Sequence, residues 1–393
     1  MASRPLLGIL SPLVILLASC GAAPVGDNPT EANTRQRSPF QTTEIARFDE
    51  PWAMAFDPGT GVLFVTEKKG RIRFLEPSGK MGFVEGVPRV DYGGQGGLGD
   101  FVFAPAEPSP TLDRRTVYLS WVEAGRGDKR GAAVGRAELI CNDHSSCTLR
   151  NLKVIWRQEP KTTGHGHYSH RIAFSPDGRY LFIASGDRQK QEPAQDLSNN
   201  LGTIVRLLPD GMPAPGNPFS RLGGVSRQIW SYGHRNILGL AFDDQDRLWD
   251  VEHGPRGGDE FNLVKEGANY GWPVVSNGKH YSGTAIPHHS TRPEFTAPAT
   301  SWAPVIAPGN MIFYRGDLFP EWKGQALIAA LQPGAIVRVA IDGDKAREVA
   351  RYPMQRSIRA LAEHRDGSIW ILEDGRNTSS SRLLKLTPRT QPN

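Results

Sequence analysis

The 393-residue sequence has no large excess of charge of either sign and, beyond its N-terminus, no apolar run that approaches the length of a membrane-spanning helix. Its 46 Lys and Arg residues oppose 41 Asp and Glu and are dispersed, so the charge does not indicate a nucleic-acid partner. No amphipathic pattern is long enough for a major helix, which disfavours enzymes with helical layers. The 43 Gly and 31 Pro follow no period, which excludes collagen and indicates many turns.

The N-terminus has the pattern of a secretory signal. Arg4 precedes an apolar run over residues 5–17 that is too short to span a bilayer comfortably. The run LASCG that ends at Gly21 resembles the lipobox of bacterial lipoproteins. The alternative is an ordinary signal peptide with an incidental cysteine. We therefore expect a signal peptide over residues 1–19, membrane attachment through a lipid on Cys20, and a lipid-anchored place in the bacterial cell envelope that faces the periplasm or the outer surface.

The segment that follows, residues 20–42, is rich in Ala, Pro, Gly, Asn and Thr and has almost no large apolar side chains. This composition is typical of a flexible tether. We expect one catalytic domain to occupy residues 43–393.

Two further cysteines, Cys141 and Cys147, enclose five residues. In an oxidising compartment they could close a disulfide at the tip of a hairpin. The alternatives are two free thiols and, least favoured, a metal site that includes His144.

A short apolar strand, a turn and a second apolar strand recur along the chain. Asp-Gly and Pro-Asp-Gly sequences at the turns are typical of tight hairpins, because Gly accepts a positive φ. The first strands of the copies lie at residues 53–56, 100–103, 172–174, 240–242, 311–314 and 360–361. Roughly 60 residues per unit over the ~350 residues after the tether gives about six units, which predicts an all-β, six-bladed β-propeller.

Loops between blades converge at one mouth of a propeller, so chemistry is expected in the Gly-rich segments between the repeats. The loop 93–98 is Gly-rich. The segment 164–171 contains three histidines. They could form a metal site, supply a general base, or be surface residues without a functional role. The segment 232–236 contains an Arg-Asn pair. The loop 252–260 is rich in oxygen ligands that suit calcium.

Together and in this order, these segments resemble the glucose/sorbosone dehydrogenase family, most closely its soluble aldose sugar dehydrogenases that use pyrroloquinoline quinone (PQQ). The resemblance covers about residues 46–387. Its most specific stretches are GQGGL at 94–98, QDLSNNLG at 195–202, GHRN at 233–236 and the run 252–272. It implies a six-bladed propeller that oxidises aldoses at C1 to lactones by hydride transfer to PQQ, with calcium bound and electrons passed to an external acceptor of unknown identity.

The resemblance also implies roles for individual residues around the cofactor. The catalytic base matches His167, which would take the proton of the anomeric hydroxyl. Arg235 and Asn236 match residues beside the cofactor, and the Arg235 guanidinium could stabilise negative charge on the reduced quinone. Gln95 and Arg359 match further cofactor contacts.

Two calcium sites are implied as well. The main-chain carbonyls of Gly254 and Pro255 match the ligands of the cofactor's calcium, whose Lewis acidity would polarise the quinone. Glu260 and the backbone oxygen of Tyr270 match a second, structural calcium site. For Asp259, ligation is about as good an interpretation as a carboxylate that is solvated or braces a loop.

The sequence departs from the family pattern at two cofactor positions. Gln332 stands where a Lys is usual, and Ser357 stands where the first of two arginines is usual. The second of these arginines matches Arg359. The side chain of Arg356 could compensate by moving to the position of the missing arginine. A hydrogen bond to a charged group contributes ~1.5–3 kcal/mol, so one lost partner could weaken PQQ binding roughly 10- to 100-fold.

The alternative function is a non-catalytic, envelope-anchored propeller that binds a sugar or protein partner with a decayed cofactor site. A calcium-dependent hydrolase on a propeller is a third interpretation.

Overall fold

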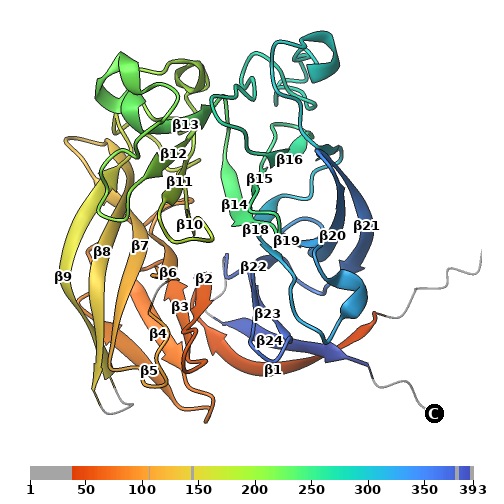
Figure 1. Ribbon diagram of the computed structural model, residues 1–393. Helices are drawn as coiled ribbons and strands as arrows, with labels where there is room; N and C mark the ends of the chain where they lie inside the picture. Colours follow the sequence, from red (N-terminus) through yellow and green to blue (C-terminus); the bar gives the residue numbers. More distant parts are fainter. Residues whose placement is uncertain (1–37, 106, 143–145, 377–379, 390–393) are drawn as a thin grey trace, which may run out of the picture. The chain divides into compact units, whose positions relative to one another are not determined.

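The computed structural model describes residues 38–105, 107–142, 146–376 and 380–389. Within these residues the secondary structure consists of 24 β-strands and five 3-10 helices, with no α-helix (Figure 1). No helix in the described ranges is long and apolar enough to cross a membrane. The expected signal peptide, Cys20 and His144 lie outside the described residues.

The strands form six four-stranded antiparallel blades. The first contains β2 (Pro51–Phe56), β3 (Leu63–Glu67), β4 (Arg71–Leu75) and β5 (Met81–Glu85), and the second contains β6 (Leu98–Phe103), β7 (Arg114–Ala124), β8 (Arg130–Asn142) and β9 (Ser146–Arg157). The third contains β10 (Ser169–Phe174), β11 (Leu181–Ser185), β12 (Thr203–Leu207) and β13 (Ile229–Tyr232), and the fourth contains β14 (Ile237–Phe242), β15 (Leu248–Glu252), β16 (Asp259–Leu263) and β17 (Thr300–Trp302).

The fifth blade contains β18 (Pro308–Phe313), β19 (Ala326–Ala330), β20 (Ala335–Asp342) and β21 (Lys345–Pro353), and the sixth contains β22 (Ile358–Glu363), β23 (Ile369–Glu373), β24 (Ser381–Pro388) and β1 (Phe40–Phe48). The 3-10 helices lie in the connections at Glu192–Gln195, Ser220–Leu222, Gly224–Gln228, His289–Thr291 and Pro320–Trp322. The first two blades form one eight-stranded sheet, because the outer strands β5 and β9 pair in parallel. The six-bladed propeller expected from the repeats is thereby confirmed.

The first strands of the blades, β2, β6, β10, β14, β18 and β22, contact one another in ring order around the centre (Figure 1). They contain the six repeated apolar segments recognised in the sequence. Each one has a shift of register near its start, as between Pro51 and Ala53 or between Ile358 and Ala360. A β-bulge redirects the side chain within it, so these strands can turn one residue toward the centre before they join the core.

The sixth blade is closed by both ends of the described chain. Strand β1 pairs antiparallel with β24 from Phe40 opposite Pro388 to Phe48 opposite Ser381. Figure 1 shows this red strand beside the blue C-terminal strand. Phe40 is buried and starts the strand, so the blade begins inside the segment 20–42 that was expected to be a tether. The polar side chains that follow Phe40 hide this boundary in the sequence, because they face solvent on an edge strand.

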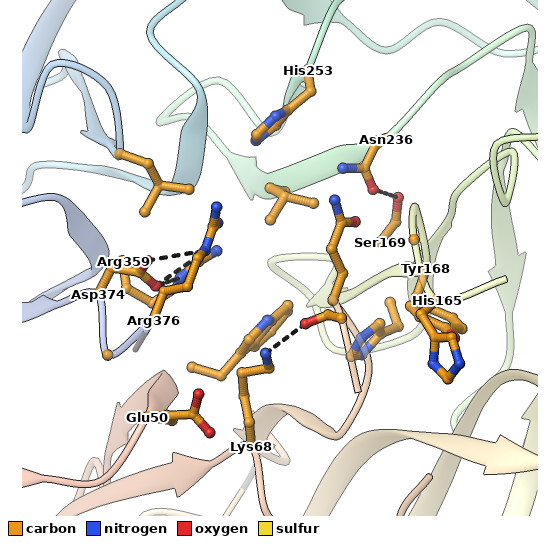
Figure 2. Close-up of a pocket in the computed structure, with 18 of the residues that line it drawn as sticks. Glu50, Lys68, His165, Tyr168, Ser169, Asn236, His253, Arg359, Asp374 and Arg376 are labelled. Carbon is orange, nitrogen blue, oxygen red and sulfur yellow. Dashed lines mark hydrogen bonds and ion pairs between the residues drawn. The ribbon is translucent and has the colours of Figure 1, made fainter. Parts of the chain in front are cut away.

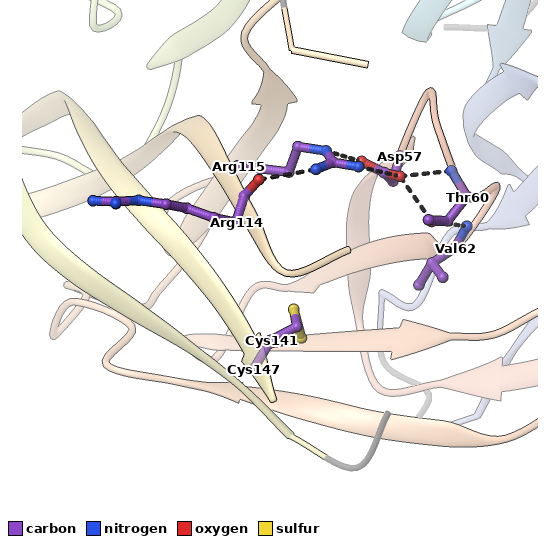
Figure 3. The surroundings of a disulfide bond; sticks show 7 residues. All are labelled: Asp57, Thr60, Val62, Arg114, Arg115, Cys141 and Cys147. Atoms are coloured by element: carbon purple, nitrogen blue, oxygen red, sulfur yellow. Dashed lines mark hydrogen bonds and ion pairs between the residues drawn. A yellow bond between two sulfur atoms is a disulfide. The ribbon is translucent and has the colours of Figure 1, made fainter. Parts of the chain in front are cut away.

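A disulfide joins Cys141 and Cys147 at the tip of the β8–β9 hairpin (Figure 3). The two residues are direct cross-strand partners. Cys147 also pairs with Val84 of β5, so the disulfide lies where the first two blades join. The structure therefore contains the disulfide, rather than the free thiols or the metal site that the sequence also leaves open for these cysteines.

A buried ion pair links the same two blades (Figure 3). Nε of Arg115, on β7, donates to Oδ1 of Asp57 over 2.7 Å, and Asp57 follows β2. Both side chains are almost fully buried, and Asp57 also accepts hydrogen bonds from the amide and hydroxyl of Thr60. The pair is therefore desolvated and fully hydrogen-bonded, as a buried charge requires.

Candidate active site

A cavity of about 430 Å³, here called the central pocket, lies at the end of the ring where the first strands of the blades begin (Figure 2). Trp52, His170, Leu238 and Arg359 line it. Each of these residues lies within the bulge of its strand, at β2, β10, β14 and β22. The bulges thus turn side chains from four blades into one pocket, and the remaining wall comes from loops beside them.

His167 lies in the loop before β10, between Gly166 and Tyr168, which line this pocket. It is 6% exposed, and its backbone has a φ of 50°, a left-handed conformation that is uncommon for a residue with a side chain. Its amide donates to Oε1 of Gln95 over 2.7 Å. Such strain persists only where the surroundings impose it, and it is typical of functional loops.

The imidazole of His167 is oriented by Asp187, which sequence analysis did not single out. The distance from Nδ1 of His167 to Oδ1 of Asp187 is 2.6 Å. The second oxygen of Asp187 accepts from Nε1 of Trp272 over 2.8 Å. A carboxylate on Nδ1 leaves Nε2 as the basic nitrogen of the ring. Burial lowers the pKa of His167, although the bond to Asp187 opposes that shift.

Arg235 lies beside His167 and is 5% exposed. Its Nη1 donates to the backbone oxygen of His253 over 3.0 Å, and its Nη2 lies 3.2 Å from the hydroxyl of Tyr281. Its buried Nε has no hydrogen-bond partner in the described part of the chain. A buried N–H without a partner costs free energy, so this atom is suited to an oxygen of a ligand.

Gln95, Asn236 and Arg359 line the central pocket. His167 and Arg235 do not line it, but His167 is hydrogen-bonded to Gln95 and Arg235 precedes Asn236. Oδ1 of Asn236 accepts from the hydroxyl of Ser169 over 3.4 Å. Nε of Arg359 donates to Oδ1 of Asp374 over 2.9 Å. The structure therefore brings the five residues predicted around the cofactor into one region.

Arg356 does not take the place of the missing arginine. Its Nη1 lies 3.9 Å from Glu373, and its side chain is half exposed and does not line the pocket. The Ser357 hydroxyl donates to the backbone oxygen of Leu331. Two cations that sequence analysis did not identify, Lys68 and Arg376, line the pocket instead. Nothing in the local sequence marks them, since they reach the pocket only because distant blades meet.

The turn with Gly254 and Pro255 follows His253, whose ring lines the central pocket, although the turn itself does not line it. Asp259 braces this turn: Oδ1 accepts from the amide of Gly254, and Oδ2 accepts from the amides of Ile306 and Ala307. These hydrogen bonds agree with the interpretation of Asp259 as a residue that braces a loop. Burial raises the pKa of Asp259 to about 6.

Glu260 belongs to a buried group of acids outside the central pocket. Ligand atoms of His234, Asp250 and Glu252 lie within 4.8 Å of one another, and Glu252 is the cross-strand partner of Glu260. Burial, together with the charge of Glu252, raises the pKa of both Asp250 and Glu260. One oxygen of Asp250 and the side-chain oxygen of Asn262 are buried without a hydrogen-bond partner in the described residues. Such a group of oxygen atoms is suited to a hard cation.

The backbone oxygen of Tyr270 is connected to Glu260 through His289. Nε2 of His289 lies 3.0 Å from this oxygen, and its Nδ1 lies 3.9 Å from Oε1 of Glu260. A carbonyl has two lone pairs, so Tyr270 can still contribute a ligand. The two residues expected at a structural calcium site therefore lie in one region, separate from the residues around the pocket.

The model of the glucose/sorbosone dehydrogenase family matches residues 48–385. This chain belongs to that family. It is 36% identical over 388 residues to the aldose sugar dehydrogenase YliI of Escherichia coli, with 97% of this chain and 98% of that relative covered.

Solved structures agree with this assignment. The soluble aldose sugar dehydrogenase of Escherichia coli in its apo form superposes with a TM-score of 0.79 at 35% identity, covering 89% of this chain and all of that one. The PQQ-bound form of an aldose sugar dehydrogenase from Streptomyces coelicolor superposes with a TM-score of 0.70 at 25% identity, covering 89% and 98% of the two chains.

Proposed function

We propose that this member of the glucose/sorbosone dehydrogenase family is a PQQ- and calcium-dependent aldose sugar dehydrogenase. The observation that carries the proposal is the pair of His167 and Asp187, which lies with Arg235 next to residues that line the central pocket. The family membership and the resemblance to aldose sugar dehydrogenases support the same activity.

The residues around the pocket fit the cofactor. The orphaned Nε of Arg235 is placed to donate to an anionic oxygen, and Gln95, Asn236 and Arg359 supply further polar contacts in the wall. PQQ supplies a quinone that accepts a hydride, which the protein side chains cannot do. The chain's own task is to hold that group, to remove a proton from the sugar and to stabilise negative charge.

His167 is the proposed general base. With Nδ1 bonded to Asp187, its Nε2 lone pair accepts the proton of the anomeric hydroxyl as C1 loses hydride and the sugar becomes a lactone. Burial keeps the imidazole neutral near pH 7 because it lowers the pKa of His167. Asp187 stabilises the imidazolium that forms, as a carboxylate does on the far side of a catalytic histidine.

Two calcium sites complete the proposal. The carbonyls of Gly254 and Pro255 would hold an ion that polarises the quinone, and the turn is kept in place by Asp259. Glu260 and the backbone oxygen of Tyr270 would hold a structural ion. The unpartnered oxygens of Asp250 and Asn262 nearby favour a cation in that region.

Reconstitution tests the activity. PQQ and calcium are added to the purified apo-protein, and reduction of an artificial dye is followed with a panel of aldoses. We expect turnover that requires both PQQ and calcium. No turnover with any aldose and no spectral change of the quinone would favour the alternative, a propeller that binds a sugar or protein partner without catalysis. The external electron acceptor is not identified by this assay.

We also propose that the protein is anchored to the cell envelope by a lipid on Cys20, on the sequence pattern alone. Expression of the full chain in a bacterial host with labelled palmitate tests this. We expect label in the wild-type protein and none in Cys20→Ser. Equal labelling of the two would contradict the anchor.

A further inference from the structure

The central pocket is lined by three cations that differ in their partners (Figure 2). Nη2 of Arg359 lies 2.8 Å from Oδ1 of Asp374, and Nε of Arg376 lies 3.6 Å from Oδ2 of the same carboxylate. In the described part of the chain, Lys68 has no carboxylate within 4.0 Å. It is therefore the pocket cation whose charge is not already committed to an acid.

The side chain of Lys68 is held at the pocket by its surroundings. It lies just after β3, and its Nζ donates to the backbone oxygen of Gly94 over 2.8 Å, next to Gln95. An ammonium group has three donors, so two remain for a ligand. Burial lowers the pKa of Lys68, with opposing contributions from Glu50. A partly desolvated cation of this kind gains more from an anionic partner than an exposed one does.

The backbone of Lys68 is equally constrained. Its amide donates to the oxygen of Glu50, and its oxygen accepts from the amide of Leu98. Gly97 packs so closely that a Cβ there would lie 2.2 Å from the oxygen of Lys68. The loop that presents Lys68 is thus fixed between the first and second blades, and little ordering is needed when a ligand arrives.

We propose that Lys68 binds a carboxylate of PQQ and supplies the positive charge that the family pattern places at positions 332 and 357. The inference rests on the proposed function, because it concerns how the same pocket holds its cofactor. PQQ has three carboxylates, whereas Gln332 and Ser357 are uncharged and Arg356 is directed at Glu373. In Figure 2 the ammonium of Lys68 rises from the side of the pocket opposite Asn236 and His253. A cofactor bound between them would meet all three residues.

The test measures PQQ binding to the apo-protein with calcium in excess, by calorimetry or by quenching of tryptophan fluorescence. Lys68→Gln is expected to raise Kd roughly 10- to 100-fold, as the loss of one charged hydrogen bond predicts. Lys68→Arg is expected to retain most of the affinity. Rising ionic strength is expected to weaken the wild type more than Lys68→Gln, because the variant has lost one charge interaction.

The matched control is Lys69→Gln. Lys69 is the next residue, carries the same charge and is paired with Asp49, but does not line the pocket. Its substitution is expected to leave Kd unchanged, and circular dichroism checks that both variants are folded. Equal Kd values for Lys68→Gln and Lys69→Gln would overturn the role of Lys68. A change in KM for the aldose at unchanged Kd for PQQ would also overturn it, and a wild type that binds no PQQ would overturn the proposed function as well.

Discussion

Nδ1 of His167 and Oδ1 of Asp187 lie 2.6 Å apart, although the two residues are separated by a whole strand hairpin. His167 precedes β10, and Asp187 follows β11, so the first hairpin of the third blade brings them together at its open end. Trp272 fixes Asp187 from another blade. The proposed base is thus positioned by the first hairpin of the third blade, and its partner Asp187 is fixed by Trp272 of the fourth blade.

Replacement of the base itself is the first prediction. His167→Ala is expected to lower kcat roughly 100- to 10,000-fold, because general-base catalysis contributes that much. The Kd for PQQ is expected to change little. The matched control is His288→Ala, an exposed histidine that is expected to keep wild-type kcat. If His167→Ala loses PQQ binding rather than kcat, the assignment of His167 as base is wrong.

Asp187→Asn tests the positioning of His167. An amide in place of the carboxylate can donate to Nδ1 and place the ring proton on Nε2, which removes the basic lone pair from the side of the sugar. We expect kcat to fall roughly 100-fold or more while PQQ binding and the thermal midpoint stay close to wild type. Unchanged kcat would show that the imidazole does not depend on Asp187.

The pH dependence of turnover follows from the burial of His167. Since its folded-state pKa is lowered and its neutral form is the active one, kcat/KM is expected to fall only as the pH drops through a value below 6.5. An ordinary histidine would lose activity near pH ~6.5. The acid limb is measured over a pH series with saturating PQQ and calcium. An acid limb centred above pH ~6.5 would contradict the desolvated site.

The buried pair of Asp57 and Arg115 yields a stability prediction. Arg115→Met leaves the Asp57 carboxylate buried without its cation, which costs about 3–5 kcal/mol. The double variant Asp57→Leu with Arg115→Met is expected to be more stable than Arg115→Met alone. Chemical unfolding of the mature domain measures both. If Arg115→Met unfolds at the wild-type denaturant concentration, the pair does not contribute to the junction of the first two blades.

Local features of the sequence determined the blades. Each first strand ends in a short apolar run before a turn, as at Phe174 before Pro176-Asp177-Gly178, and such patterns depend only on neighbouring residues. Three residues that the family motifs single out, Gln95, Asn236 and Arg359, line the central pocket. The start of β1, in the sixth blade, falls inside the segment expected to be a tether, because β1 is an edge strand whose pairing partner is at the other end of the chain.

Only the tertiary structure decided which side chains meet at the mouth of the propeller. Asp187, Lys68 and Arg376 carry no local signal, since their roles come from residues in other loops and other blades. Burial, which lowers the pKa of His167 and leaves Nε of Arg235 without a partner, likewise arises when the ring closes. Turn chemistry acts over a few residues, whereas the charges and desolvation of a site depend on atoms that the chain brings together from far apart.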